Sequence, residues 1–545
     1  MKWKNSFKKG SLAAFVTLAL TGSALAMPTG GTVENGSVNV DAANFGANDA
    51  IANVANGATI TPQTNSIINW EAFNIAQGEA LHFNTTNAAL LNRVTGAQMS
   101  ELLGQMTQVG AKPLFLVNPN GIHIGGTASF DVSNLTLSTL NMDTAEFNRP
   151  KGQGEWALKQ GAQGAKELRV DTGAQFNIRN DGSLALTAGK VMVADGVTFV
   201  ADSAEHSGLY ISAYKNSTVE GKKETGETEA GNTIDFRGKV SGVKHLEMNA
   251  SNINIEGADL AGKDIVIRSV AKGQVEKTAT NEITTLTAAP TNTLTVKNTK
   301  VVGDQITMIG GKVDVADDVK FSLNADNHKA ELTVAAAKSY FDENQGSSKF
   351  ATEQGNDVSF HGTVESSGYW NYTAMEIDGA TVNLDRAKFH TPNGELSANA
   401  FQSAEDKADD TWTMTATAAN VVQADDLEIV GNRNDTEFWG GKVELKNTTI
   451  KTPGEVQVYA YKTFAKGSID TKDMTAGADS VVQLTNTKIL NEGSDPQAYS
   501  NVWVRGGKIE MNNSELASED EIRLTASNSL HEVRGERHIP KELKM

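Results

Sequence analysis

The sequence predicts an all-β chain, specifically a right-handed parallel β-helix with an N-terminal cap and loops that leave the helix. The first observation is composition: the 545 residues include 50 glycines, only 10 prolines and 6% aromatic residues. This mixture suits many short strands closed by polar turns. The second observation is a short recurring unit, and the third is apolar alternation with a period of two on both sides of tight turns. Together they favour a solenoid over packed helices.

The recurring unit reads apolar-x-apolar-x-Asn-[Thr/Ser]-x-apolar. Asparagine tolerates a left-handed backbone and its amide can bond to neighbouring peptide groups, so we expect a corner at each Asn. The alternate apolar residues should then point inward and stack on those of neighbouring coils. Four copies place the corner residue at Asn298, Asn447, Asn486 and Asn513.

A Gly-Gly-Lys sequence marks the start of several of these units, at Gly310, Gly440 and Gly506. The last two starts lie 66 residues apart, which predicts about three coils between them. Polar or small-residue segments interrupt the pattern and are predicted to be loops projecting from the rod; they span residues 151–167, 220–232, 271–292, 335–356 and 402–410. Residues 98–106 have apolar residues at roughly helical spacing and are predicted to form a short helix or helical turn.

The two ends of the sequence differ from the rest. Residues 1–26 have a basic start, a short apolar run and small residues at Ala24 and Ala26, the pattern of a cleaved signal peptide. The apolar run is too short for a permanent membrane span. We therefore expect a mature chain that begins at Met27, outside the inner membrane of a bacterium. Residues 534–545 are predicted to be a charged tail.

Charge and cysteine content limit the possible partners and stabilising bonds. The formal net charge of −18 disfavours non-specific binding to nucleic acid and docking on an anionic membrane. The chain has no cysteine, so packing and backbone hydrogen bonds must stabilise it.

Signals for catalysis or cofactor binding are weak. The nine histidines are dispersed without an HxH or HxxxH pair, so we expect no metal site. Residues 257–264 imitate a phosphate-binding loop, but Asp264 replaces the magnesium-binding Ser/Thr and strand-like residues flank the segment. We expect a turn there, and no cofactor. A β-helix polysaccharide-active enzyme would need carboxylates converging on one face; the sequence offers Asp259, Asp314, Asp378 and Glu444 but cannot align them. The prediction is therefore not an enzyme.

One stretch, residues 115–126, combines a tight turn with two strand-like flanks. Three apolar residues run into Asn118-Pro119-Asn120-Gly121, and Ile122 opens the next alternation. Proline fixes φ at the second turn position, while Asn and Gly accept the later ones. This predicts two strands joined by a small polar turn.

Several motifs occur around this turn in a fixed order. INWEAFNI supplies Trp70, Phe73 and Ile75, LNRVTG supplies Asn92 and Arg93, and NPNGI spans residues 118–122. This order resembles the N-terminal secretion domain of two-partner-secretion exoproteins, the filamentous-haemagglutinin-like family. The resemblance covers about residues 28–170. The chain departs from the family in having a single Asn-Pro-Asn motif and in lacking a proline within residues 84–87.

The resemblance implies an export domain over residues 27–250, followed by a β-helix repeat region over 251–533. Its partner would be an outer-membrane β-barrel transporter, with export through the periplasm and folding outside. The residues it implies in secretion or transporter recognition are Asn118, Pro119, Asn120, Gly121, Asn92 and Arg93. We expect Trp70, Phe73, Ile75 and Ile122 to form the core of the cap. Arg93 is either a buried charge paired with a carboxylate or part of the surface that the transporter reads.

The predicted protein is a monomer that is secreted or held at the surface of a Gram-negative-type bacterium. Its activity is predicted to be adhesion or another surface interaction, with the ligand unidentified. Three alternatives stay open: a pore-forming haemolysin or cytolysin of the same route, a protein that captures a host factor, and a β-helix polysaccharide-active enzyme.

Overall fold

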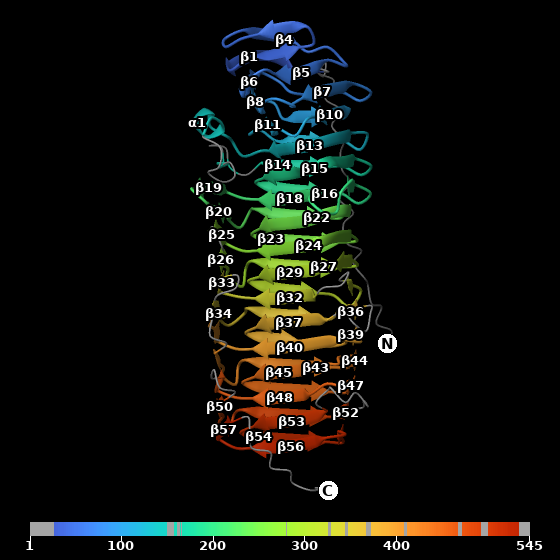
Figure 1. The fold of residues 1–545 in the computed structure, drawn as a ribbon, viewed down its shortest axis with the longest axis vertical. Helices are drawn as coiled ribbons and strands as arrows, with labels where there is room; N and C mark the ends of the chain where they lie inside the picture. The colour runs from blue at the N-terminus through green and yellow to red at the C-terminus, as the bar shows by residue number, and fades with distance from the viewer. Residues whose placement is uncertain are drawn as a thin grey trace, which may run out of the picture.

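The computed structural model describes residues 27–149, 157–160, 164, 166–278, 281–324, 329–343, 347–366, 372–407, 411–466, 471–491 and 500–533. The predicted signal peptide, with Ala24 and Ala26, and the predicted tail lie outside the described residues. The described chain winds into an elongated rod of stacked strands (Figure 1). Among the described residues no helix is long and apolar enough to cross a bilayer, and α1 (Thr144–Phe147) has four residues.

Two sheets form the rod. Within the described residues the narrow sheet has 14 strands, ordered from β54 (Lys508–Asn512) to β9 (Ser100–Leu102), and neighbouring strands pair in parallel. For example, β46 (Lys442–Lys446) lies between β43 (Val421–Asp425) and β51 (Val481–Thr485). The wide sheet has 32 strands and bends within its long strands: β13 (Ser129–Ser138) pairs with β10 (Gln105–Val109) and then with β11 (Leu114–Val117). This stacking confirms the predicted parallel β-helix.

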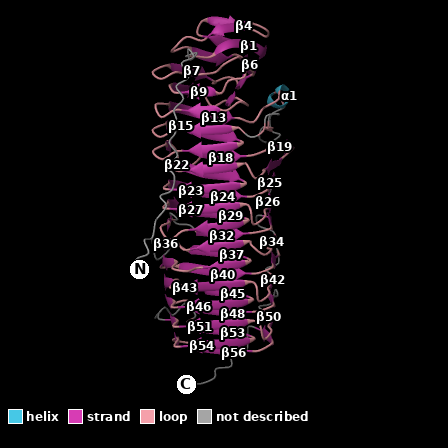
Figure 2. Cartoon of the chain, turned by 180° about the vertical axis from the view of Figure 1, so that it is seen from behind, coloured by secondary structure: helices cyan, strands magenta, loops and turns pink. Residues whose placement is uncertain are grey.

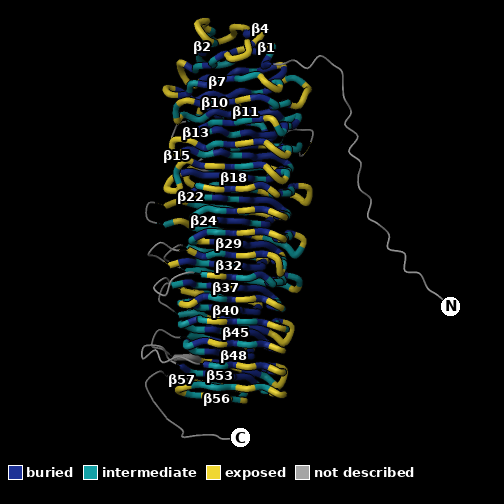
Figure 3. Tube along the Cα trace, turned by 90° about the vertical axis from the view of Figure 1, so that its right-hand side faces the viewer, coloured by how far each residue is buried: buried dark blue, intermediate teal, exposed yellow. Residues whose placement is uncertain are grey.

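The rod is filled by alternate side chains that stack from coil to coil. In β46, Val443 and Leu445 point inward and are at most 1% exposed. Phenylalanine rings stack at 4.8 Å between Phe130 and Phe176 and again between Phe176 and Phe199. That spacing matches the distance of about 4.8 Å between neighbouring strands. Buried residues follow the strands and exposed ones gather at the turns (Figure 3).

The predicted Asn corners are present. Asn298, Asn447, Asn486 and Asn513 all have φ between 44° and 50°. The amides of the last three also bond to one another: Asn486 Nδ2 donates to Asn447 Oδ1 at 3.1 Å, and Asn513 Nδ2 donates to Asn486 Oδ1 at 2.8 Å. The corner residues therefore form a ladder along one edge of the rod.

The predicted coil count was wrong. In the narrow sheet, β46, β51 and β54 (Lys508–Asn512) are consecutive, so Gly440 and Gly506 lie two coils apart and not three. The coils are longer than expected because the coil between β46 and β51 also contains two strands outside the rod. These are β49 (Thr463–Lys466) and β50 (Thr471–Thr475).

The described parts of four of the predicted loops contain strands. They belong to a third sheet, the hairpin sheet, in which the described residues form 11 strands, each paired antiparallel with its neighbours. Its strands form a column beside the rod (Figures 1 and 2). In order they are β19 (Asn216–Glu220), β20 (Lys223–Glu227), β25 (Lys272–Lys277), β26 (Glu282–Thr287), β33 (Ser339–Glu343), β34 (Ser348–Ala351), β41 (Ser403–Asp406), β42 (Trp412–Thr415), β49, β50 and β57 (Ser529–Val533).

The segments looked like loops because one face of the hairpin sheet is polar and exposed. Successive hairpins leave the rod on the same side, so the coil stacking brings their backbones within pairing distance. The fifth predicted loop, 151–167, is described only in part. There Lys159 bridges Asn141 and Asn216, which extends the edge of the hairpin sheet.

The predicted helix over residues 98–106 was also wrong. This segment contains β9 (Ser100–Leu102) and the start of β10. Met106 is buried while Met99 is 41% exposed, so the apolar residues do not share one helical face. Parallel pairing with the coils on either side overrides the local helical spacing.

The N-terminal end of the rod is closed by antiparallel strands. Here β1 (Thr29–Asn35) pairs with β4 (Ala50–Asn53) and β6 (Ser66–Trp70), and β2 (Val38–Val40) pairs with β3 (Ala43–Phe45) and β5 (Thr59–Pro62). Parallel pairing begins with β5 to β7 (Ala80–Asn84) and β6 to β8 (Leu90–Val94). The antiparallel strands thus cover the first coil, where an open end would expose strand edges. The predicted domain boundary at residue 250 stays a prediction. The two strands next to it, β22 (Lys239–Ala250) and β24 (Asp259–Ser269), pair within one continuous sheet.

Candidate functional site

The Asn-Pro-Asn-Gly turn joins β11 to β12 (Ile122–Ile124). The N–H of Gly121 donates to the carbonyl of Asn118 at 3.1 Å and closes the turn. Gly121 has φ of 124°, which disfavours residues with a Cβ. The N–H of Ser100 donates to the Gly121 carbonyl at 3.0 Å, so the turn is bonded to the preceding coil.

The Asn118 side chain is fully buried and uses its complete hydrogen-bonding capacity. Its Nδ2 donates to the Gln98 carbonyl and to Ser100 Oγ, both at 3.0 Å. Its Oδ1 accepts from the backbone N–H of Asn120 at 2.9 Å and from Asn120 Nδ2 at 3.1 Å. Asn120 Nδ2 also donates to the Gly96 carbonyl at 2.8 Å. The two amides fasten the turn to residues 96–100, and Pro119 and Asn120 remain partly exposed.

Asn92 has a similar place in the neighbouring β8. Its Oδ1 accepts from Trp70 Nε1 at 3.0 Å, and its Nδ2 donates to the Phe115 carbonyl at 3.2 Å. Trp70 contacts Phe73 edge to face, with ring centroids 5.9 Å apart. The structure places the four expected core residues at no more than 1% exposure; they are Trp70, Phe73, Ile75 and Ile122.

Arg93 lies on the outer side of the wide sheet and is only 14% exposed. Its Nε donates to Asn69 Oδ1 at 2.9 Å, and its Nη1 donates to the Met142 carbonyl at 3.2 Å. Its Nη2 forms an ion pair with Glu34. Of the two interpretations of Arg93, the structure shows the charge paired with a carboxylate.

Glu34 connects this arginine to two further segments. It accepts from Asn69 Nδ2 at 2.6 Å and from the Thr144 hydroxyl. Burial alone would raise the pKa of Glu34, but the bonds from Thr144, Asn69 and Arg93 outweigh it and hold the pKa below its ordinary value. The sequence did not single out Glu34, Asn69 or Thr144, because they are 110 residues apart at the extremes and belong to no shared motif.

This polar network lies beside an apolar cluster outside the rod. Ile67, Leu91 and Phe115 are buried although they do not belong to the rod core, because a segment after β13 covers them. That segment contributes Leu140, Met142, Phe147 and Leu158. The uninterrupted apolar run 114–117, buried at all four positions, was the available signal of burial on both faces.

The narrow sheet carries a polar outer face. On it, His123 lies between Glu101 and Asp171, with Nδ1 2.6 Å from Glu101 Oε2 and Nε2 2.9 Å from Asp171 Oδ2. The hydrogen bond with Glu101 and that with Asp171 raise the pKa of His123 to about 9, against the effect of burial. Among the described residues no group of His, Asp or Glu is arranged to hold a metal ion.

The four carboxylates considered for catalysis do not converge. Asp314 and Glu444 lie on the narrow sheet, whereas Asp259 and Asp378 lie on the wide sheet. Asp378 is 5% exposed, accepts from Asn399 Nδ2 at 2.8 Å, and has a pKa raised well above its ordinary value by burial.

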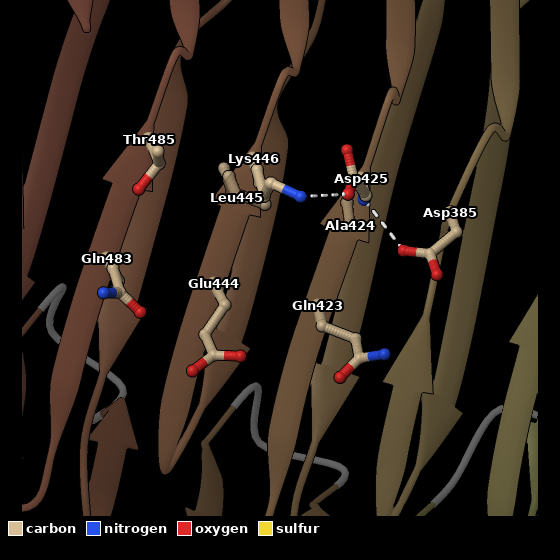
Figure 4. Close-up of a pocket in the computed structure, with 9 residues that line it drawn as sticks. All are labelled: Asp385, Gln423, Ala424, Asp425, Glu444, Leu445, Lys446, Gln483 and Thr485. Atoms are coloured by element: carbon tan, nitrogen blue, oxygen red, sulfur yellow. Dashed lines mark hydrogen bonds and ion pairs between the residues drawn. The ribbon is translucent and has the colours of Figure 1, made fainter. Parts of the chain in front are cut away.

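A shallow depression of about 350 Å³ lies around Glu444 on the narrow sheet (Figure 4). Its charged groups bond to one another: Lys446 Nζ lies 2.7 Å from Asp425 Oδ2, and the Asp425 N–H donates to Asp385 Oδ1 at 2.8 Å. Glu444 pairs with Lys442. The charged side chains of the depression therefore already have partners within the protein.

The hairpin sheet has two contrasting faces. One register row faces the rod and contains Leu286, Tyr340, Phe350, Ala404, Met414, Phe464, Met474 and Leu530. This row packs on a row of the wide sheet that includes Ile309, Ala335, Trp439 and Tyr459. The opposite face is rich in hydroxyl groups; one of its rows contains Thr287, Ser339, Ala351, Ser403, Thr415, Thr463, Thr475 and Ser529.

The N-terminal half of the chain matches a known protein family. The family described as "TPS secretion domain" matches residues 26–272. This confirms the resemblance seen in the N-terminal motifs. The chain thus carries a two-partner-secretion domain over residues 26–272.

Two curated relatives are heme/hemopexin-binding proteins. That of Haemophilus influenzae (strain ATCC 51907 / DSM 11121 / KW20 / Rd) is 24% identical over 366 residues, covering 60% of this chain and 38% of the relative. Another from Haemophilus influenzae is 23% identical over 513 residues, covering 84% of this chain and 51% of the relative. The chain thus spans about half or less of their length. The crystal structure of the HMW1 secretion domain from Haemophilus influenzae aligns with 77% of this chain and 100% of its own, at 18% identity and a TM-score of 0.48.

Proposed function

We propose that this protein leaves the cell through a cognate outer-membrane β-barrel transporter and acts outside as an adhesin or other surface interaction protein, without enzymatic activity. The observation that carries the proposal is a secretion domain continuous with a rod whose hairpins form a further sheet with an exposed face, the hairpin sheet. Such a sheet offers a broad contact surface that the rod does not need for its own stacking.

The fold suits export in an extended state. Each coil pairs only with its neighbours, so coils can add one after another as the chain emerges. No disulfide can lock a fold in the periplasm, because the chain has no cysteine. In a host that expresses the transporter, we expect the protein in the culture medium or on the cell surface. Deleting the transporter gene should retain it in the periplasm, and unchanged secretion would refute the proposed route.

We propose that six motif residues act in secretion mainly by shaping the surface that the transporter recognises. They are Asn118, Pro119, Asn120, Gly121, Asn92 and Arg93. The buried amides of Asn118 and Asn92 support this, because neither is placed to contact a partner directly. Pro119 and Asn120 are the partly exposed members available for contact.

Adhesion is tested with the purified mature chain on cultured host cells. We expect saturable binding without lysis of red cells, and binding should fall when Thr413 and Ser403 on the hairpin sheet are both changed to Lys. The control is the Gln483→Lys variant on the narrow sheet, which should bind like the parent chain. Red-cell lysis would favour a cytolysin, and equal loss in both variants would remove the hairpin sheet from the proposal.

Capture of a host haem carrier is a second candidate, supported by the printed names of the two relatives. Direct haem ligation by His123 or His245 is disfavoured, because each imidazole lies between two carboxylates and has a pKa of about 9. A protonated imidazole cannot bind iron. Surface plasmon resonance with immobilised hemopexin tests this candidate, and a hemin titration followed by absorbance serves as its comparison.

A further inference from the structure

The outer face of the hairpin sheet contains a depression of about 440 Å³ across strands β26, β33, β34, β41 and β42. All of its lining residues belong to the hairpin sheet, and none comes from the rod. The depression therefore lies on the side of the hairpin sheet that faces away from the rod. Side chains of its outward rows that line it include Thr285, Phe341, Lys349, Ser403, Glu405 and Thr413.

The strand register explains the shape of this depression. Phe341 is paired with Thr285 on one side and Lys349 on the other, and Lys349 is paired with Glu405. This row of large side chains runs beside a row of small ones, which at the same strands consists of Ser339, Ala351 and Ser403. The small residues form a floor and the large residues form a wall.

The wall carries an aromatic ring and both signs of charge. Lys349 Nζ lies 3.1 Å from Glu405 Oε1, and the two side chains are 59% and 38% exposed. The pair adds no net charge, in a chain whose formal net charge is −18. An anionic ligand is therefore disfavoured, and the donors and acceptors suit a neutral ligand with many hydroxyl groups.

The backbone limits the kind of partner that can bind here. Each of the five strands is bonded to a strand on both sides within the hairpin sheet. A peptide cannot add to this region as a further strand, because no sheet edge is free. Binding must use side chains on a nearly flat surface.

We propose that this depression binds a neutral glycan. The Phe341 ring would stack on the apolar C–H face of a sugar, while Lys349, Glu405 and Thr413 would bond to its hydroxyl groups. This inference rests on the proposed surface-interaction function and names its ligand class.

The test uses the full mature chain on an array of galactose-, glucose- and mannose-terminated oligosaccharides, printed beside sialylated counterparts. We expect binding to neutral glycans, and a loss of affinity of about tenfold in the Phe341→Ala variant. The Glu405→Gln variant, which keeps the shape and removes one charge, should weaken binding less. The matched control is Tyr210→Ala on β18 (Gly208–Ala213), because Tyr210 is also a partly exposed aromatic residue but lies on the rod.

Full affinity in Phe341→Ala, preference for sialylated glycans, or no glycan binding by the parent chain would each overturn the inference. Circular dichroism of each variant checks that the β fold is intact. If glycan binding fails while host-cell binding persists, the proposed function stands and only the ligand class is wrong.

Discussion

Two regions of the wide sheet bury outward-facing side chains in different ways. Near the N-terminus, a single segment around α1 covers Ile67, Leu91 and Phe115, and its position is fixed by the Glu34–Arg93–Thr144 network. Further along, the hairpin sheet covers the rod through rows of apolar and aromatic residues centred on Trp439. The first cover depends on a few directional polar bonds, and the second on contact area. We therefore expect the two regions to respond differently to substitution and to pH.

The largest effect is expected at the aromatic centre of the second region. Trp439 is 1% exposed and contacts the rings of Trp412, Tyr459 and Phe464 at centroid distances of 4.4–5.6 Å. Trp439→Ala should lower the free energy of unfolding by about 4 kcal/mol, because it leaves a large cavity. Urea denaturation measures this, and Val430→Ala at a 38% exposed site is the control, with an expected change below about 0.5 kcal/mol.

The next effect is expected at Arg93. Arg93→Ala leaves Glu34 partly buried without its cation and should cost about 3 kcal/mol. Limited proteolysis should then cut within residues 140–160 before the hairpin sheet is attacked. The matched control is Arg237→Ala, whose partner Glu256 lies 3.0 Å away; both side chains are about half exposed, so the cost should stay below about 1 kcal/mol. Equal proteolysis of the two variants would contradict the role given to the network.

A smaller loss of stability, with a larger loss of export, is expected for Asn118→Asp. The substitution removes the N–H groups that donate to the Gln98 carbonyl and to Ser100 Oγ, and it places a carboxylate oxygen against the Gln98 carbonyl, at a cost of about 2 kcal/mol. Export in a transporter-expressing host should fall. The control is Asn44→Asp at an exposed position of the cap, which should be exported normally. Normal export of the Asn118→Asp variant would show that the motif is a turn with no specific role in export.

The smallest effect concerns pH. Because the pKa of His123 is raised to about 9, its ion pairs stabilise the fold fully below pH 6.5, and this contribution disappears as the pH rises through 9. His123→Gln should therefore lose on the order of 1 kcal/mol at pH 6 and nothing at pH 10. Glu34 behaves oppositely: its lowered pKa stabilises above pH 4.5, and this contribution is lost on acidification below that value. Thermal melts at pH 3, 6 and 10 measure both effects.

The sequence was sufficient for features that repeat locally. Alternating apolar residues indicated the rod, and the Asn corners at 298, 447, 486 and 513 were found because αL tolerance is a property of the residue itself. The hairpin sheet was missed because its segments have one polar face and are separated by whole coils, so their pairing becomes visible only when the coils stack. The coil count failed for the same reason.

The candidate site was likewise predictable only in its locally encoded parts. The motif residues around Asn118 were recognised from their order, but the burial of Asn118 and Asn92 followed only from the positions of Gln98, Ser100 and Phe115 in neighbouring coils. Glu34 and Thr144 could not be linked to Arg93 by any spacing, because three different segments meet there. The depression beside Phe341 depends on the register of strands whose pairing no sequence pattern indicated.

The hairpin sheet also has a mechanical consequence. Along the hairpin-bearing part of the rod, neighbouring coils pair within the rod, and the hairpins of every second coil also pair with one another. For example, β42 and β49 pair although they leave the two coils on either side of β45 (Thr436–Gly440). Pulling this part of the rod apart along its axis must break hydrogen bonds of the rod and also those of one pair of hairpin strands. A rod that is anchored at one end and pulled at the other should therefore resist extension most strongly along the side that carries the hairpin sheet. Under a lateral force it should bend most easily toward the direction that leaves the hairpin sheet unstretched.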